Sequence, residues 1–191
     1  DEYKAVLVSC TEELTRVTRI VNDMLFLAQV SHPAALVPFA RIELADEAHK
    51  VAELFSLSAQ DKHISLQVSG VGATLGDRLM IQRAISNLLS NAIRHCPPGQ
   101  SISLAVEDLG EQVAVRVVNP GPGIGEEHLP HLFERFYRVD NSRSRAQGGT
   151  GLGLAIVRSI MSLHQGVVQV QSAPHRLTEF RLVFPNGERA A

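Results

Sequence analysis

The sequence predicts an α/β protein in which a layer of helices covers one face of a mixed sheet, preceded by a long separate helix. Two observations lead to this prediction. The first 30 residues contain no glycine or proline and repeat apolar residues at helical spacing. From about residue 39 onward, segments of helical period alternate with short runs in which apolar and polar residues alternate. We therefore expect a compact domain that carries a helical arm.

The arm is expected to be a single helix within residues 1–31. Its apolar residues recur at alternating spacings of three and four, the pattern of a coiled-coil seam: Leu7, Cys10, Leu14, Val17, Val21, Met24 and Ala28. A stripe this narrow needs a partner helix, so we interpret the arm as one helix of a hairpin or dimer. Packing on the rest of this chain is the alternative. Pro33 ends the helix, because the residue before a proline is disfavoured in the α region, and residues 32–38 form a linker.

Residues 39–191 are expected to form the domain, which begins with two helices separated by a strand. Asp46 is predicted to cap the first helix, whose apolar face consists of Ala48, Val51, Ala52, Phe55 and Ala59. Residues 63–69 alternate apolar and polar side chains, which predicts a strand. Asp77 is predicted to cap a longer helix that extends through Cys96 and is closed by Pro97, Pro98 and Gly99.

The second half of the domain is predicted to contain a hairpin, one helix and two further strands. Residues 101–107 and 112–119 alternate apolar and polar side chains on either side of a turn at residues 108–110, as in a β-hairpin. A polar stretch rich in glycine and arginine then extends to Gly149. The last predicted helix and the two strands after it cover residues 151–164, 167–171 and 180–184.

Composition and charge exclude several classes of function. The chain has 18 basic and 20 acidic residues without long runs, so no surface for nucleic acid is expected. Two cysteines neither form a disulfide scaffold nor provide paired metal ligands, which favours a reducing compartment. No apolar run approaches the roughly 18 residues that a membrane span needs. Because the sequence opens at Asp1 without methionine, we expect a fragment whose membrane attachment, if any, lies upstream.

The helix over residues 77–96 carries a polar stripe on one face. Residues at spacings of three and four share a face of a helix, and here they are Arg83, Asn87, Asn91, Arg94 and His95. Two amide oxygens one turn apart can hold magnesium, and cations one turn further can meet phosphate oxygens. Asparagines that are merely solvated are the alternative interpretation of this stripe.

Two glycine-rich turns follow strands or begin a helix. The first, Asn119 to Gly125, comes directly after a strand and lets the backbone approach a flat ligand closely. The second, Gly148 to Leu154, opens a helix whose free N–H groups suit a polyphosphate. Neither turn matches a dinucleotide fingerprint or a P-loop. A tight turn without a ligand is the alternative for each.

In their order along the chain, four segments resemble the N, G1, F and G2 boxes of the sensor histidine kinases. They are residues 87–92, 119–124, 133–138 and 148–154, and His164-Gln165-Gly166 and Thr178-Glu179-Phe180 extend the resemblance. The resemblance implies the two-layer α/β sandwich of the gyrase and histidine-kinase ATP-binding type, with about three helices. The segments around Met24 to Ala28 and Leu132 to Asp140 are similar to the copper- and silver-type heavy-metal-sensing branch.

The resemblance also implies that ATP and magnesium are the ligands. Asn91 matches the magnesium-binding asparagine with Asn87 as its partner, and Asn119 matches the residue that recognises the adenine amino group. Residues between Phe133 and Gly148 would form a lid over the nucleotide. The full set of expected nucleotide-binding residues is Asn87, Asn91, Arg94, His95, Asn119, Gly121, Gly123, Ile124, Tyr137, Arg138, Gly149, Thr150, Gly151, Leu152, Gly153 and Leu154.

The sequence departs from the family pattern at several positions. The family usually has aspartate where this chain has Asn119, and an amide accepts a weaker hydrogen bond than a carboxylate. Arg94 replaces the usual lysine, and Leu177 stands where glycine is common. No histidine has the sequence context of a phosphoacceptor, so we expect that histidine upstream of Asp1 and no catalytic residue within the chain.

The expected function is therefore the ATP-binding catalytic domain (39–191) of a sensor histidine kinase, joined to the C-terminal helix of its dimerisation hairpin. The resemblance implies a homodimer, a response regulator as partner, and a place in the cytoplasmic portion of a bacterial inner-membrane protein. A gyrase-type ATPase and a non-catalytic nucleotide-binding or dimerisation module are the alternatives. A metal site at His128 and His131 is disfavoured, because no further ligands lie nearby in the sequence.

Overall fold

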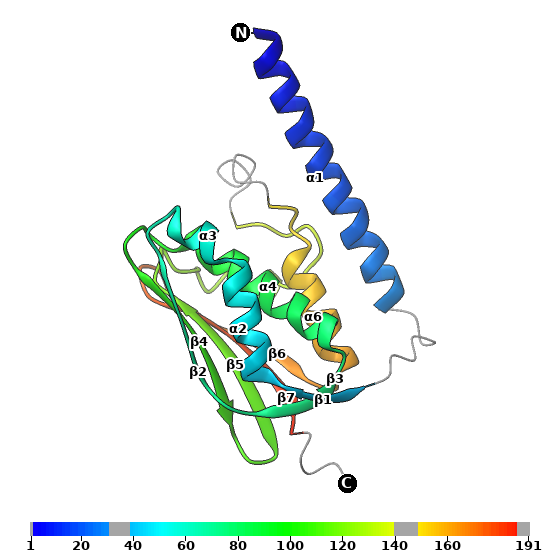
Figure 1. The fold of residues 1–191 in the computed structure, drawn as a ribbon, viewed down its shortest axis with the longest axis vertical. Helices are drawn as coiled ribbons and strands as arrows, with labels where there is room; N and C mark the ends of the chain where they lie inside the picture. Colours follow the sequence, from blue (N-terminus) through cyan, green and yellow to red (C-terminus); the bar gives the residue numbers. More distant parts are fainter. Residues whose placement is uncertain (1, 31–38, 140–148, 187–191) are drawn as a thin grey trace.

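The computed structural model describes residues 2–30, 39–139 and 149–186. It shows a five-stranded sheet with helices packed on one face and a long helix, α1, that extends away from them (Figure 1). The predicted fold class is confirmed. The linker expected at residues 32–38 lies outside the described residues, and the domain boundaries stay a prediction.

The described helices and strands follow one another in an α/β order. The helices are α1 (Glu2–Val30), α2 (Leu44–Leu54), α3 (Ser56–Gln60), α4 (Arg78–His95) and α6 (Gly153–Leu163), with a 3-10 turn η1 (Leu129–His131). The strands are β1 (Ala40–Glu43), β2 (Ser65–Gly70), β3 (Ala73–Gly76), β4 (Ser101–Asp108), β5 (Gln112–Asn119), β6 (Val167–Gln171) and β7 (Thr178–Pro185).

The main sheet has the strand order β2-β4-β5-β7-β6. β2 and β4 are parallel, and the other neighbours are antiparallel. The hairpin predicted at residues 101–119 is confirmed as β4 and β5. β1 and β3 pair separately as a two-stranded antiparallel ladder. The Thr74 hydroxyl of β3 donates to the carbonyl of Pro185 at 2.8 Å, which ties this ladder to the end of β7.

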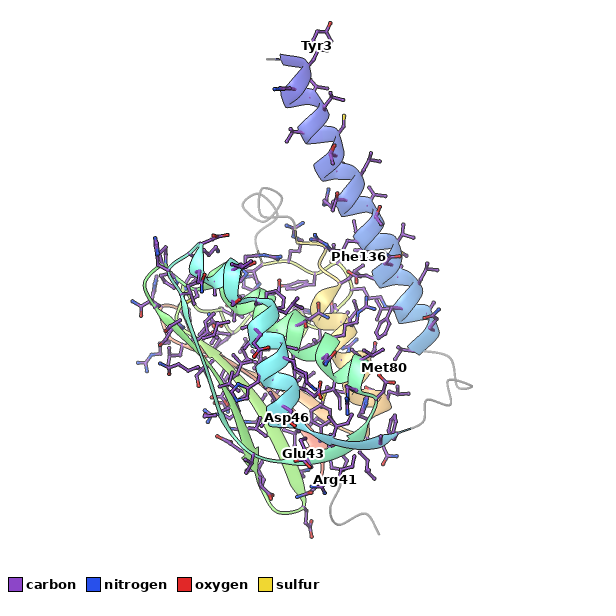
Figure 2. The ribbon with its side chains drawn as sticks, in the orientation of Figure 1. Tyr3, Arg41, Glu43, Asp46, Met80 and Phe136 are labelled. Carbon is purple, nitrogen blue, oxygen red and sulfur yellow. The ribbon has the colours of Figure 1, made fainter. Side chains whose placement is uncertain are left out.

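Two predictions about the first helix of the domain are wrong. It begins at Leu44, after Glu43, and Asp46 lies inside its first turn (Figure 2). There the carboxylate still favours the positive end of the helix dipole. The helix also ends at Leu54, and Phe55, with a φ of −94° and a ψ of 2°, separates α2 from α3. The face that was predicted as continuous therefore belongs to two helices, of which α3 contributes Ala59.

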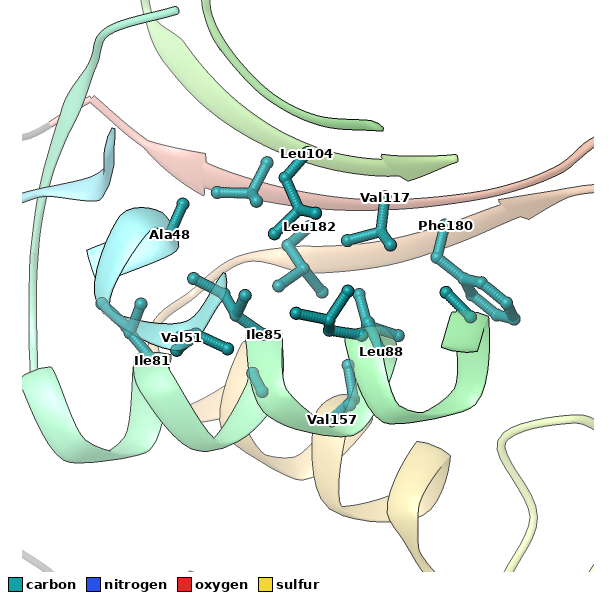
Figure 3. Packing of buried hydrophobic residues seen from close by; sticks show 14 of the residues in the cluster. Ala48, Val51, Ile81, Ile85, Leu88, Leu104, Val117, Val157, Phe180 and Leu182 are labelled. Atoms are coloured by element: carbon teal, nitrogen blue, oxygen red, sulfur yellow. The ribbon is translucent and has the colours of Figure 1, made fainter. Parts of the chain in front are cut away.

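The hydrophobic core lies between the sheet and the helices α2, α4 and α6 (Figure 3). Leu104, Val117, Phe180 and Leu182 project from the strands and are at most 2% exposed. Side chains of the three helices meet them: Ala48, Val51, Ile81, Ile85, Leu88 and Val157. Burial of each large side chain stabilises the fold by about 2 kcal/mol. This layer fixes how α4 and α6 lie on the sheet.

The opposite face of the sheet carries charged side chains. Arg116 of β5 donates to both carboxylate oxygens of Glu179 on β7, at 3.0 and 2.6 Å, and also pairs with Glu107 of β4. The hydrogen bonds from Arg116 hold the pKa of Glu179 below its usual value. This face is therefore polar, and the apolar layer is confined to the side where the helices lie.

The arm, α1, presents two different faces. Every residue of the predicted seam is exposed, from Leu7 to Ala28. A second stripe packs on the domain instead: Ile20, Phe26 and Leu27 contact the core, and Val30 is 9% exposed. The helix therefore packs on its own chain without using the seam. Within the described residues, no helix is long and apolar enough to cross a membrane.

Candidate functional site

The polar stripe of α4 lies beside the start of α6. Asn87 is so close to Gly153 that a Cβ built on the glycine would be 3.2 Å from the asparagine Oδ1. His164 follows α6, and Asp77 precedes α4. At this other end of the two helices, the His164 ring accepts a hydrogen bond from the backbone N–H of Asp77. The two helices are therefore antiparallel. This arrangement brings the C-terminal half of α4 and the N-terminus of α6 to one end of the helical layer.

Asn119 ends β5 at the same end of the molecule. Its side chain is 4% exposed, and its Nδ2 donates to the carbonyl of Pro120 at 2.9 Å. Because a carbonyl can only accept, this contact fixes the orientation of the amide and leaves Oδ1 as an acceptor. A Cβ on Gly121 would be 2.9 Å from the carbonyl of His95. The end of β5 and the end of α4 therefore meet, as the expected site requires.

The first glycine-rich turn is held against residues 172–175. Gly123 has a φ of +72°, and a Cβ there would lie 1.9 Å from the carbonyl oxygen of Ala173. The backbone N–H of Ile124 donates to the Ser172 hydroxyl at 3.0 Å, and this hydroxyl is 2.8 Å from that of Thr178. Sequence reasoning missed Ser172 and Thr178 as supports of the turn. Only their proximity after folding reveals the role.

The second glycine-rich turn runs between the segment around Phe136 and α6. Gly151 has a φ of +72°, and a Cβ there would be 2.8 Å from the Phe136 Cα. Its carbonyl accepts from the N–H of Phe136 at 2.8 Å, while the Phe136 side chain is exposed (Figure 2). Leu152 precedes α6 without capping it by a side chain. The first N–H groups of α6 therefore have no side-chain cap among the described residues.

The side chains of Leu152 and Leu154 belong to the core, although both residues were expected in the nucleotide site. Leu152 is fully buried, and Leu154 is partly buried against the core. Only their backbone atoms can reach a ligand. The same holds for Ile124, which also packs on the core. The glycines between these residues supply the close backbone approach, and the apolar side chains anchor the turns.

Arginines gather beside this turn. A Cβ on Gly149 would lie 2.6 Å from Nη1 of Arg94 and 3.9 Å from Nη2 of Arg138. Burial lowers the pKa of Arg94, and the neighbouring cations Arg138 and Arg19 lower it further. Arg19 belongs to the arm, so three separate segments of the chain bring positive charge together. Close cations repel one another, and an anion between them would relieve this repulsion.

The remaining stripe residues have different surroundings. Nδ2 of Asn87 is buried and has no hydrogen-bond partner among the described residues, which leaves a donor to be satisfied by a ligand or by water. Asn91 is half-buried one turn further. His95 keeps an exposed surface, yet partial desolvation and the cations Arg94 and Lys62 lower its pKa. The neutral imidazole is therefore the favoured form near neutral pH.

Arg83 of the stripe faces the arm. Its Nη2 donates to Asp23 of α1 at 2.8 Å, and its guanidinium carbon lies 3.8 Å from the centre of the Phe26 ring. The other Asp23 oxygen accepts a hydrogen bond of 3.5 Å from the Thr150 hydroxyl. The arm thus contacts both the stripe and the second glycine turn. No pattern in the sequence singled out Asp23 for this contact.

Tyr137 lies at the beginning of the expected lid. Its hydroxyl is hydrogen-bonded to Nδ1 of His128 at 2.8 Å, and its ring packs on the core. His131 is paired with Glu134 at 2.8 Å. In the part of the chain that the structure describes, no group of three or more His, Cys, Asp or Glu side chains could hold a metal. Residues 140–148 of the expected lid lie outside that part.

Comparisons with known proteins agree with this geometry. Residues 76–188 match the family described as histidine kinase-, DNA gyrase B-, and HSP90-like ATPase. The chain is 48% identical to the sensor histidine kinase CusS of Escherichia coli O157:H7 over 185 residues. The aligned residues cover 96% of this chain and 38% of CusS. It is 42% identical to the probable sensor kinase SilS of Salmonella typhimurium, over 98% of this chain and 39% of SilS. The chain therefore spans about two fifths of the length of these relatives.

A solved structure has a similar fold. Full-length ShkA in complex with AMPPNP superimposes with a TM-score of 0.83 and 25% sequence identity, over 100% of this chain and 40% of ShkA. Both of these relatives are named as sensor kinases, as the four boxes imply. These matches favour neither of the two alternatives considered from the sequence.

The close contact at Gly123 leads to a test of the first glycine turn. Gly123→Ala should lower the free energy of unfolding by about 3 kcal/mol, because the methyl group collides with the Ala173 carbonyl in addition to the positive φ. Gly110→Ala is the matched control, since Gly110 has a φ of +85° and open space around it. It should cost only about 1–2 kcal/mol. Urea unfolding of both variants measures the difference, and equal losses would show that the contact with Ala173 is unimportant.

Proposed function

Because the chain belongs to the histidine kinase-, DNA gyrase B-, and HSP90-like ATPase family, we propose that it is the ATP-binding catalytic domain of a sensor histidine kinase. It binds ATP between the stripe of α4, the end of β5 and the two glycine turns. One observation carries this proposal. Arg94 and Arg138 meet beside Gly149 at the uncapped N-terminus of α6, which is an arrangement suited to a polyphosphate.

The residues around this point fit the other parts of the nucleotide. Oδ1 of Asn119 accepts from the adenine amino group, and the turn from Gly121 to Gly123 lies beside the flat base. Asn91 and Asn87 hold magnesium through their amide oxygens, and the buried Nδ2 of Asn87 is left to donate to a ligand oxygen. Magnesium, when bound, neutralises charge on the phosphates. Tyr137 and Arg138 stand where a lid begins.

The chain's own contribution to the reaction is placement and charge. Phosphoryl transfer demands alignment of the acceptor and stabilisation of the phosphate oxygens, with little covalent work by the protein. Arg94 and the N–H groups of residues 153 and 154 at the start of α6 provide the positive potential, while the N–H of Leu152 donates to the Thr150 hydroxyl. The acceptor is a histidine outside this chain. His95 lies on the same rigid helix as Asn91, where it can stand beside the phosphates but not approach opposite the leaving oxygen.

The arm suggests how the acceptor is delivered. The exposed seam pairs with the other helices of a dimerisation hairpin, so the intact kinase is a homodimer. The packed face, with Asp23 and Phe26, meanwhile holds the domain on the arm. The phosphoryl group then passes from histidine to an aspartate of a response regulator. We place the chain in the cytoplasmic portion of a bacterial inner-membrane protein that responds to a heavy metal.

Nucleotide binding is the direct test. The protein should bind ADP in the presence of magnesium, and Asn91→Ala should weaken this binding about tenfold, a loss of about 1.4 kcal/mol. Its stability should not change, because Asn91 lies on the polar face of α4. Calorimetric titration measures the affinity, with Ser86→Ala, outside the stripe, as the control. No heat with the wild-type protein at millimolar nucleotide would refute the proposal, and unfolding of Asn91→Ala would make Asn91 structural.

Asn119→Asp tests the orientation of the amide. A carboxylate accepts stronger hydrogen bonds, which from the sequence alone favours tighter binding of adenine. In the structure, however, an aspartate would place a second oxygen about where Nδ2 lies, 2.9 Å from the Pro120 carbonyl. We therefore expect no gain in ADP affinity and a loss of stability of about 1 kcal/mol at neutral pH. Titration and thermal unfolding measure both. Tighter binding with unchanged stability would show that the Pro120 contact does not matter.

The location of the acceptor is tested with labelled ATP. Incubated alone, the protein should not acquire an acid-labile, base-stable phosphoryl group. Supplied with the segment of the intact kinase that carries the acceptor histidine, it should support labelling of that segment. Asn91→Ala should reduce this labelling. Strong labelling of the chain alone would mean that one of its own histidines is the acceptor.

A further inference from the structure

His164 lies at the opposite end of α4 and α6 from the proposed site. It directly follows α6 and is 2% exposed. Its Nδ1 is 2.8 Å from the carbonyl oxygen of Ile160, which can only accept, so Nδ1 carries the ring hydrogen. Nε2 is then an acceptor, and it receives the backbone N–H of Asp77 at 3.0 Å. The imidazole is therefore neutral and joins the end of one helix to the beginning of the other.

The ring is held in place from several sides. Phe39 stacks on it with ring centres 4.7 Å apart and an angle of 7° between the planes, and Phe184 meets it edge-on at 6.0 Å. A Cβ on Gly76 would lie 2.6 Å from the ring. Burial also lowers the pKa of His164, against the opposing effects of the Ile160 carbonyl and the Asp77 carboxylate. Position and tautomer are thus both fixed.

Asp77 is the point from which α4 starts. Its side chain accepts from the N–H of Met80 at 2.8 Å, so the residue that His164 contacts is also the helix cap. From Asp77 to Asn87 the helix rises about 15 Å, and from Gly153 to His164 about 16 Å. Since helices are stiff and these two lengths agree, the contact at one end determines which residues meet at the other.

We propose that His164 is a positioning residue that sets the register of α4 against α6, and through it the separation between Asn87 and Asn91 and the second glycine turn. A sliding of one residue would move the asparagines by about 1.5 Å relative to Gly153. Displacements of about this size are enough to disturb strongly the alignment of groups that a reaction needs. The consequence for nucleotide rests on the proposed function, whereas the register itself does not.

The test compares substitutions that keep or remove the acceptor. In His164→Gln the side-chain oxygen can reach the Asp77 N–H as Nε2 does, whereas in His164→Asn the shorter amide reaches only the Ile160 carbonyl. Both lose the aromatic contacts with Phe39 and Phe184, and they differ from each other by one methylene group. Gly76→Ala provides another variant that keeps the imidazole, and its methyl group would lie 2.6 Å from the His164 ring and 2.8 Å from Cδ1 of Ile81.

Two readouts are measured under conditions in which each variant is folded. The first is the affinity for ADP with magnesium, which should fall about tenfold in His164→Asn and Gly76→Ala and stay within about threefold of wild type in His164→Gln. The second is the nuclear Overhauser effect between the Asn87 side-chain amide and Gly153. It should be lost in His164→Asn and in Gly76→Ala, and retained in His164→Gln.

The outcomes separate a positioning role from a merely structural one. If folded His164→Asn or Gly76→Ala keeps both the Overhauser effect and the wild-type affinity while being less stable, the proposal is overturned. If His164→Asn does not fold, Gly76→Ala decides in the same way. If the wild-type protein binds no nucleotide, the proposed function fails, and the Overhauser effect still decides whether His164 sets the register.

Discussion

Packing of α4 and α6 side by side on one face of the sheet limits where the polar groups of these two helices can lie. Both helices bury an apolar face against β4, β5 and β7, so neither can rotate without exposing several fully buried side chains. The stripe of α4 is forced to the edge of this layer, next to the beginning of α6. The end of β5 joins them because Gly121 leaves no room for a side chain against the His95 carbonyl.

Much of this arrangement could be predicted from the sequence. Strong local signals predict α4 from its long segment of helical periodicity, its Asp77 cap, and the β4–β5 hairpin. Each of these predictions is confirmed. β1 and β3 could not be predicted, because each has only four residues and is stabilised by its partner and by the Thr74 contact with β7. Asp46 was wrongly predicted as a cap, because aspartate is favoured both at the N-cap and within the first turn of a helix.

The site was predictable at the level of motifs and not of contacts. The order and spacing of the four boxes along the sequence identified Asn87, Asn119 and Gly149 as candidate site residues. In the folded chain they lie at one end of the molecule. The roles of Ser172, Asp23 and His164 depend on partners 48 to 127 residues away in sequence, so no local pattern reveals them. The exposed seam of the arm illustrates the opposite case: a clear local pattern identified it, and the described structure leaves it exposed.

The amide of Asn119 has a consequence for proton balance at the end of β5. A carboxylate there would have to lose its proton in a nearly dry position, and its acceptor strength would vary as it titrated. An amide has no proton to lose in water, and the Pro120 carbonyl holds its orientation. A hydrogen bond accepted by Oδ1 therefore neither releases nor takes up a proton at this residue. The acceptor strength of this oxygen is the same in acidic and in alkaline solution.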